Sequence, residues 1–127
     1  MPRDFDLKSP LYWLCGAFAL GLLLIGLLAL IAPHNAAALF GMPVTTIDAL
    51  PWVRLAGIRD IALSLMLLAI MAMKAGRIAG ILILLMIVVP LTDATTVFTQ
   101  SGLTYQVLLH AGSIIFMAIL GLLLIRQ

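Results

Sequence analysis

Four long apolar stretches, separated by short polar ones, dominate the pattern of this chain. Each is close to the roughly 20 residues that an α-helix needs to cross a bilayer. Lipid admits only helices or closed barrels, and the alternation of a barrel strand is absent. The pattern therefore predicts an all-α integral membrane four-helix bundle, a single domain of residues 1–127 with spans at approximately 11–32, 52–73, 77–98 and 104–125.

The composition excludes other classes of protein. Hydrophobic residues make up 65% of the 127 residues and charged residues 9%, whereas soluble domains have about 25% charged residues. The seven Lys and Arg residues are scattered, so we expect membrane lipids and no nucleic acid as partners. The single cysteine, Cys15, cannot form an intramolecular disulfide, and no Cys/His spacing indicates a metal site.

The placement of Lys and Arg predicts the orientation in the membrane. Four spans put both termini on one side, and that side then carries five Lys or Arg residues against one, Arg54, on the other. The five are Arg3, Lys8, Lys74, Arg77 and Arg126. We therefore expect a multi-pass protein of the cell inner (plasma) membrane with cytoplasmic termini and an outer loop at 33–51. The first span is too long for a signal peptide and is interpreted as a retained anchor.

Proline and glycine predict local features. In the outer loop, Asn35 to Phe40 followed by Gly41 predicts a short helical turn with a glycine stop. Pro90 cannot donate to the carbonyl of Met86, so we expect a kink in the third span.

Small residues predict how the helices pack. Gly16, Gly21 and Gly26 recur in the first span, and Gly76 and Gly80 form a small-xxx-small pair in the third. Such positions let helix backbones approach closely. We favour packing within the bundle, with a homo-oligomer seam as the alternative.

Four ionisable residues fall inside the predicted spans at a similar depth. From a rise of about 1.5 Å per helical residue, Arg59 and Asp60 lie about 10–12 Å below the outer surface, and Asp93 and His110 about 9 Å below it. Charges in a membrane are costly and rarely lack a partner or a function. The sequence therefore predicts that spans two, three and four bring these groups together around an outward-facing pocket.

Polar side chains near this level are candidate ligand contacts. Gly57, Asp60 and Ser64 share one helix face, and Gln106, His110 and Ser113 form a stripe on the last span. The predicted substrate-binding residues are Ser64, Thr92, Thr96, Gln106 and Ser113.

The cluster suits acid–base chemistry on a small apolar or amphipathic molecule, of isomerase or hydrolase type. Asp60 or Asp93 would be the base, His110 the proton donor and Arg59 the orienting cation. No cofactor is expected, and haem ligation by His110 with His34 is disfavoured because His34 falls in the headgroup region.

Three alternatives stay open at this point. The cluster can serve a proton-coupled small-molecule transporter, since proton relays use Asp and His. The chain can be a non-catalytic accessory or binding subunit. Finally, pairing of Arg59 with Asp93 and of Asp60 with His110 can serve only to fix the helix register.

Several ordered motifs resemble a known family. They are Gly57-Ile-Arg-Asp60, Pro90-Leu-Thr-Asp93, His110-Ala-Gly112 and, in the outer loop, Leu39-Phe-Gly-Met-Pro43. Together they are similar to a family of small four-span bacterial membrane proteins known only as a domain of unknown function. The resemblance implies a compact four-helix membrane bundle with shared polar residues at Arg59, Asp60, Asp93 and His110, and it implies no reaction.

Overall fold

The computed structural model describes residues 5–127, which form six α-helices, one 3-10 turn and no strand. Arg3, counted in the orientation argument, lies outside these residues. The elements are α1 (Pro10–Ile31), α2 (Pro33–Phe40), η1 (Ile47–Ala49), α3 (Leu50–Ala72), α4 (Gly76–Met86), α5 (Val88–Ser101) and α6 (Tyr105–Ile125).

Four helical segments are long and apolar enough to cross a membrane. They are Pro10–Ile31, Ile47–Ala72, Gly76–Ser101 and Tyr105–Ile125. Many large apolar side chains on these segments are exposed, as expected for helices that face lipid. The chain is therefore an all-α, multi-pass membrane protein, which confirms the predicted fold class.

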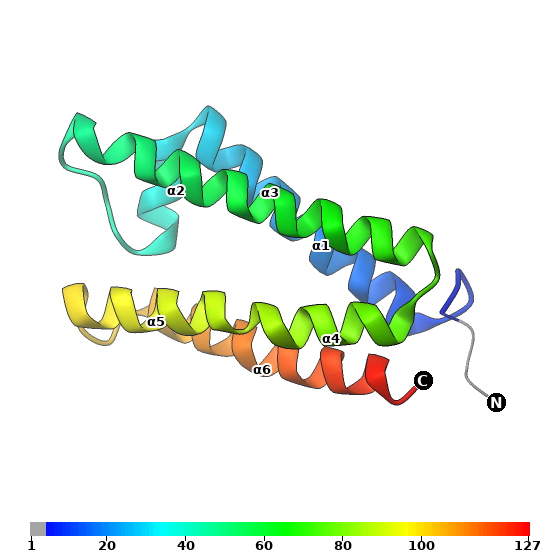
Figure 1. Cartoon of the computed structure of the whole chain (residues 1–127). Coiled ribbons are helices and arrows are strands. Elements are labelled where there is room, and N and C mark those ends of the chain that lie inside the picture. The colour runs from blue at the N-terminus through cyan, green and yellow to red at the C-terminus, as the bar shows by residue number, and fades with distance from the viewer. Residues whose placement is uncertain (1–4) are drawn as a thin grey trace.

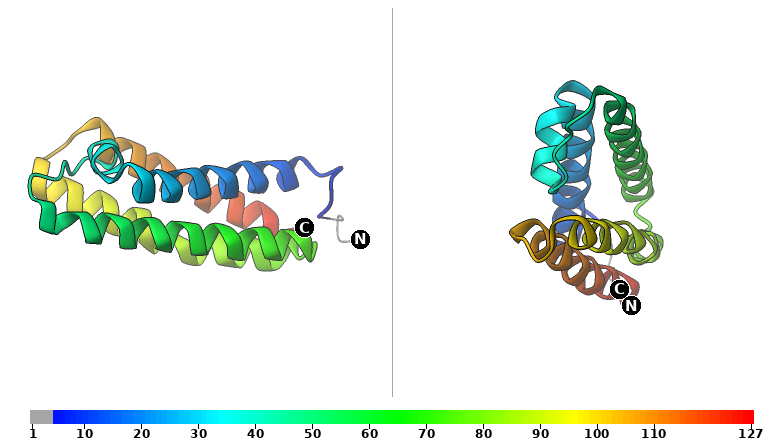
Figure 2. Two further views of the ribbon diagram at one scale, coloured as in Figure 1. Left: turned by 90° about the horizontal axis from the view of Figure 1, so that it is seen from above. Right: turned by 90° about the vertical axis from the view of Figure 1, so that its left-hand side faces the viewer.

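The helices pack as two antiparallel pairs. α1 packs along α3, and α6 packs along α4 and α5. The start of α1 and the end of α6 lie at one end of the bundle, here called the termini end, while α2 lies at the other, the α2 end (Figures 1 and 2). The pairs touch through α3 with α4 and through α1 with α6. They spread apart toward the α2 end, where α2 lies between them (Figure 1).

Glycines allow close contact within each pair. A Cβ atom on Gly26 of α1 would lie 2.7 Å from the carbonyl oxygen of Gly57 on α3. Likewise, a Cβ atom on Gly80 of α4 would lie 2.6 Å from the carbonyl oxygen of Gly121 on α6. Small residues at such crossings let backbones approach and maximise van der Waals contact in lipid. Gly26 and Gly80 thus pack within the bundle, whereas a Cβ on Gly21 would meet nothing within 4 Å.

The helix of the third span is interrupted close to the position that Pro90 predicts. α4 ends at Met86 and α5 begins at Val88, and the Ile87 N–H donates to the carbonyl of Leu84, 3.3 Å away. Because Pro90 has no N–H, the carbonyl of Met86 loses its usual helical partner. α5, which begins after this interruption, carries Asp93 three residues beyond the proline.

The outer loop contains a full helix rather than a single turn. α2 begins at Pro33 and ends where Gly41 adopts φ 102°, a left-handed conformation that favours glycine. The N–H groups of Gly41 and Met42 donate to the carbonyls of Ala38 and Ala37, which closes the helix end. The glycine stop therefore turns the chain away at the point where α2 meets α6.

Candidate functional site

Arg59 links two helices through two carboxylates. Its Nε donates to Asp60 Oδ1 at 3.0 Å, and its Nη2 lies 3.9 Å from Asp93 Oδ2 on α5. Asp60 is 8% exposed because it lies on the face of α3 that packs against α1, together with Gly57 and Ser64. The three charged groups predicted to converge are thus brought together across α3 and α5.

The Arg59 side chain retains 39% of its exposure despite both ion pairs. A guanidinium has five N–H donors, and one of them is used in the hydrogen bond to Asp60. Two carboxylates face one guanidinium, so the three groups carry a formal charge of −1. The arrangement therefore offers free donors beside an excess negative charge in the half of α3 nearer the α2 end.

His110 binds α2 rather than Asp60. Its Nε2 lies 3.1 Å from the carbonyl oxygen of Phe40, and the two rings meet edge-on with centroids 4.8 Å apart. Because a carbonyl oxygen only accepts, Nε2 carries the hydrogen, and in the neutral ring Nδ1 is the acceptor. His110 lies on α6, which packs along α5, the helix that carries Asp93. The structure therefore joins His110 to the edge of the cluster.

The suggested pairing of Asp60 with His110 is wrong in this structure. The adjacent Arg59 occupies the Asp60 carboxylate, while the end of α2 occupies the histidine. The suggested pairing of Arg59 with Asp93 is present. The depth of each residue along its helix predicted which groups lie at the same level. It did not predict which of them pair, because pairing also depends on how each helix is rotated about its axis.

The five side chains predicted to contact a ligand form hydrogen bonds or packing contacts within the fold. Thr92, Thr96 and Ser113 each donate to a carbonyl four residues earlier in their own helix. Ser64 is fully buried and donates to the carbonyl of Ala19 at 2.6 Å, so it joins α3 to α1. Gln106 lies against Gly41, where an added Cβ would meet its side chain at 2.8 Å.

The contribution of α2 is the part of the site that the sequence did not predict. The Phe40 ring and carbonyl both meet the ring of His110. The sequence feature that could have indicated this contact is an apolar residue, Phe40, directly before the glycine that ends α2. This feature predicts where α2 ends but not which helix its last turn contacts.

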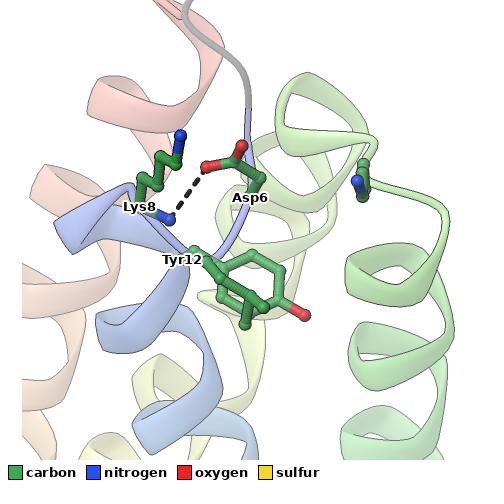
Figure 3. A pocket seen from close by; sticks show the side chains of 5 residues that line it. Asp6, Lys8 and Tyr12 are labelled. Atoms are coloured by element: carbon green, nitrogen blue, oxygen red, sulfur yellow. Dashed lines mark hydrogen bonds between the residues drawn. The ribbon is translucent and has the colours of Figure 1, made fainter.

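A cavity of about 220 Å³ lies at the termini end and not at the cluster. It is lined by Asp6, Leu7, Lys8, Tyr12 and Lys74, and it includes none of the four cluster residues (Figure 3). Within residues 5–127, no group of three or more His, Cys, Asp or Glu side chains is placed to hold a metal ion. What the cluster offers chemically is therefore charge, hydrogen-bond donors and proton acceptors.

The fold and these residues define a multi-pass helical membrane protein with an ionic cluster between its spans. Residues 19–124 match the family DUF4267, a domain of unknown function, and the chain belongs to this family. The match includes Arg59, Asp60, Asp93 and His110. No curated protein and no solved structure matches the chain.

Proposed function

We propose that the cluster of Arg59, Asp60, Asp93 and His110 binds the polar head of a small apolar or amphipathic molecule that enters from the membrane. The observation that carries this proposal is the Arg59 side chain, which is 39% exposed although carboxylates from two helices lie beside its guanidinium. Ion pairs that only fix helix register need no exposed donor, whereas a binding group does. The body of the ligand then contacts apolar surface on α3 and α5.

The proposal extends to acid–base chemistry of isomerase or hydrolase type. Asp93 is the base in this scheme, because its 3.9 Å contact with Arg59 is looser than the 3.0 Å contact of Asp60. Arg59 orients the polar head, and Asp60 fixes Arg59. His110 is the proton donor through Nδ1 of its doubly protonated ring, because Nε2 is hydrogen-bonded to Phe40, which sets the orientation of the ring.

A second candidate is a proton-coupled carrier. The formal charge of −1 on the three groups favours it, because a bound proton would neutralise the excess charge in a poorly solvating environment. In this scheme Asp93 binds the exchanging proton.

We further propose residence in the cell inner membrane with both termini cytoplasmic. Lys8, Lys74, Arg77 and Arg126 lie at the ends of helices near the termini end, while Arg54 lies near the α2 end. The excess of basic residues supports a cytoplasmic termini end.

The binding proposal is tested on the purified protein. Apolar molecules retained by the native protein are extracted with organic solvent and identified by mass spectrometry, and the same is done for Asp93→Asn and Arg59→Gln. We expect a molecule that the native protein retains and both variants lose. Arg54→Gln, which removes an exposed charge at the start of α3, is the matched control and should retain it. Identical extracts from all four proteins would overturn the proposal.

Two measurements then distinguish the candidate functions: isotope incorporation into the retained molecule and proton transport into liposomes. Incubation in heavy water should place deuterium in the retained molecule if isomerase-type chemistry occurs, and Asp93→Asn should abolish this. A hydrolase would instead incorporate oxygen from labelled water. A carrier would incorporate neither isotope, and it would move protons into liposomes containing a trapped pH-sensitive dye, with loss of this movement in Asp93→Asn.

A further inference from the structure

The cavity at the termini end is built by the segment before α1, folded against the turn between α3 and α4. The Phe5 ring is 3% exposed, and a Cβ on Gly76 would lie 2.8 Å from its Cγ. The same ring packs against Tyr12, with centroids 5.0 Å apart. Because a buried aromatic anchors it, the segment has a defined position on the bundle, independent of the site between the spans.

Hydrogen bonds shape the segment so that it forms one wall of the cavity. The Asp6 carboxylate accepts the backbone N–H of Lys8 at 2.9 Å (Figure 3). The Asp6 carbonyl accepts the N–H of Ser9 at 3.0 Å. The Trp13 indole N–H donates to the carbonyl of Leu7 at 2.9 Å. These bonds hold Leu7 and Lys8 at the mouth of the cavity.

Lys74 forms part of the opposite wall in a backbone conformation that does not suit lysine. Its φ is 56°, in the left-handed region, and it is the one non-glycine residue with positive φ among residues 5–127. Its N–H donates to the carbonyl of Met71 at 2.9 Å, which closes α3. Glycine would be the favoured residue for such a turn. A lysine at a position that favours glycine, with its side chain lining a cavity, points to a use for its charge.

The charges around the cavity favour an anion. Among the described residues that line the cavity, two are cationic, Lys8 and Lys74, one is the phenol Tyr12, and one is acidic, Asp6. A volume of about 220 Å³ is below the range of about 300–1,000 Å³ typical of sites that enclose a drug-sized ligand, so a head group fits and acyl chains stay outside. Leu7, which lines the cavity, accepts the hydrogen bond of Trp13, and both side chains are exposed at the start of the first span, where aromatic residues often mark the membrane interface.

We propose that this cavity binds the phosphate of an anionic phospholipid head group, with Lys8 and Lys74 as its cationic contacts. Basic residues next to a membrane attract anionic lipids in general. What distinguishes this site is that two of them share a preformed cavity with a phenol, while Arg77 and Arg126 lie at the same end but do not line it.

The test uses Trp13 as a reporter beside the cavity. The chain has two tryptophans, so Trp52→Phe leaves Trp13 alone. The emission of Trp13 in detergent is followed during titration with short-chain phosphatidylglycerol, phosphatidylcholine or inorganic phosphate. We expect half-saturation at a concentration about tenfold lower for phosphatidylglycerol than for phosphatidylcholine. Equal half-saturation of the two lipids would overturn the proposal, and saturation by inorganic phosphate at the same concentration would overturn its lipid assignment.

Two double variants in the Trp52→Phe background distinguish lipid binding in the cavity from general electrostatic attraction between basic residues and anionic lipid. Lys8→Gln with Lys74→Gly should lose the lipid preference while the thermal midpoint is unchanged or raised, because glycine suits the φ of residue 74. Arg77→Gln with Arg126→Gln removes the same number of positive charges from the same end and should keep the preference. Equal loss of preference in both pairs would mean general electrostatics and would refute the site.

Discussion

The Nε2 atom of His110, in the second turn of α6, lies 3.1 Å from the carbonyl oxygen of Phe40, the last residue of α2. This bond joins residues 70 positions apart and ties α2, which extends from the α1–α3 pair, to α6 of the other pair. The end of α2 is therefore held where the two pairs spread apart, beside the cluster around Arg59.

His110→Ala should loosen the end of α2. A hydrogen bond between membrane helices contributes about 0.6 kcal/mol on average, so amide hydrogen exchange in residues 37–42 should accelerate about threefold. Mass spectrometry of deuterium uptake on the protein in nanodiscs measures this. His34→Ala, at an exposed position in the first turn of α2, is the control and should leave exchange in residues 37–42 unchanged. Unchanged exchange in His110→Ala would contradict a holding role.

Gly57→Leu should destabilise the bundle, and Gly21→Leu should not. An added Cβ at residue 57 would lie 2.6 Å from the Ala29 Cβ and 2.7 Å from the Gly26 carbonyl oxygen, so α1 and α3 must separate. Overpacking of this kind costs about 1–3 kcal/mol. Gly21 has open space around its Cβ position, and leucine there improves helix propensity. Reversible unfolding in mixed micelles should show a lower free energy of unfolding for Gly57→Leu alone.

Arg59→Gln should also destabilise the protein, because it leaves the carboxylates of Asp60 and Asp93 without their cation. Hydrogen bonds to charged groups are worth about 1.5–3 kcal/mol, and the partial exposure of Arg59 puts the expected loss toward the lower end. The same unfolding measurement applies. Arg54→Gln, also on α3 but near its start and exposed, should change little.

A compensation experiment tests the cause. If the loss in Arg59→Gln comes from unpaired charge, then adding Asp60→Asn and Asp93→Asn should restore most of the free energy of unfolding. A triple variant as unstable as Arg59→Gln alone would show instead that the guanidinium stabilises the bundle by packing, and the charge argument would fail.

Features set by length and by local stereochemistry were predictable from the sequence. A bilayer needs a given length of apolar helix, so the spans follow from the apolar runs. Pro90 breaks the third span because it lacks an N–H, and Gly41 ends α2 because it tolerates positive φ. Each of these follows from one residue and its immediate neighbours.

The partners of the polar side chains were less predictable, because they depend on which helices pair and how each is rotated. Ser64 was expected in the site, but α3 turns that side chain toward Ala19 on α1. A pairing of His110 with Asp60 was suggested, but the histidine Nε2 is hydrogen-bonded to the Phe40 carbonyl at the end of α2. The cavity lined by Lys8 and Lys74 depends on a short segment with no periodicity to place it.

The proposed orientation gives a prediction that cysteine labelling checks directly. Cys15 is the only cysteine of the chain and is buried, so Cys15→Ala gives a background without thiols. In that background, Lys74→Cys places an exposed thiol in the turn between α3 and α4, and Asp48→Cys places one in η1 near the α2 end. With both termini cytoplasmic, a membrane-impermeant maleimide should label Asp48→Cys in intact cells. It should label Lys74→Cys only after the membrane is opened, because the basic residues keep that end inside. The reverse labelling pattern would invert the topology and place the Arg59 cluster in the cytoplasmic half of the membrane, where a ligand would have to reach it from the inner leaflet.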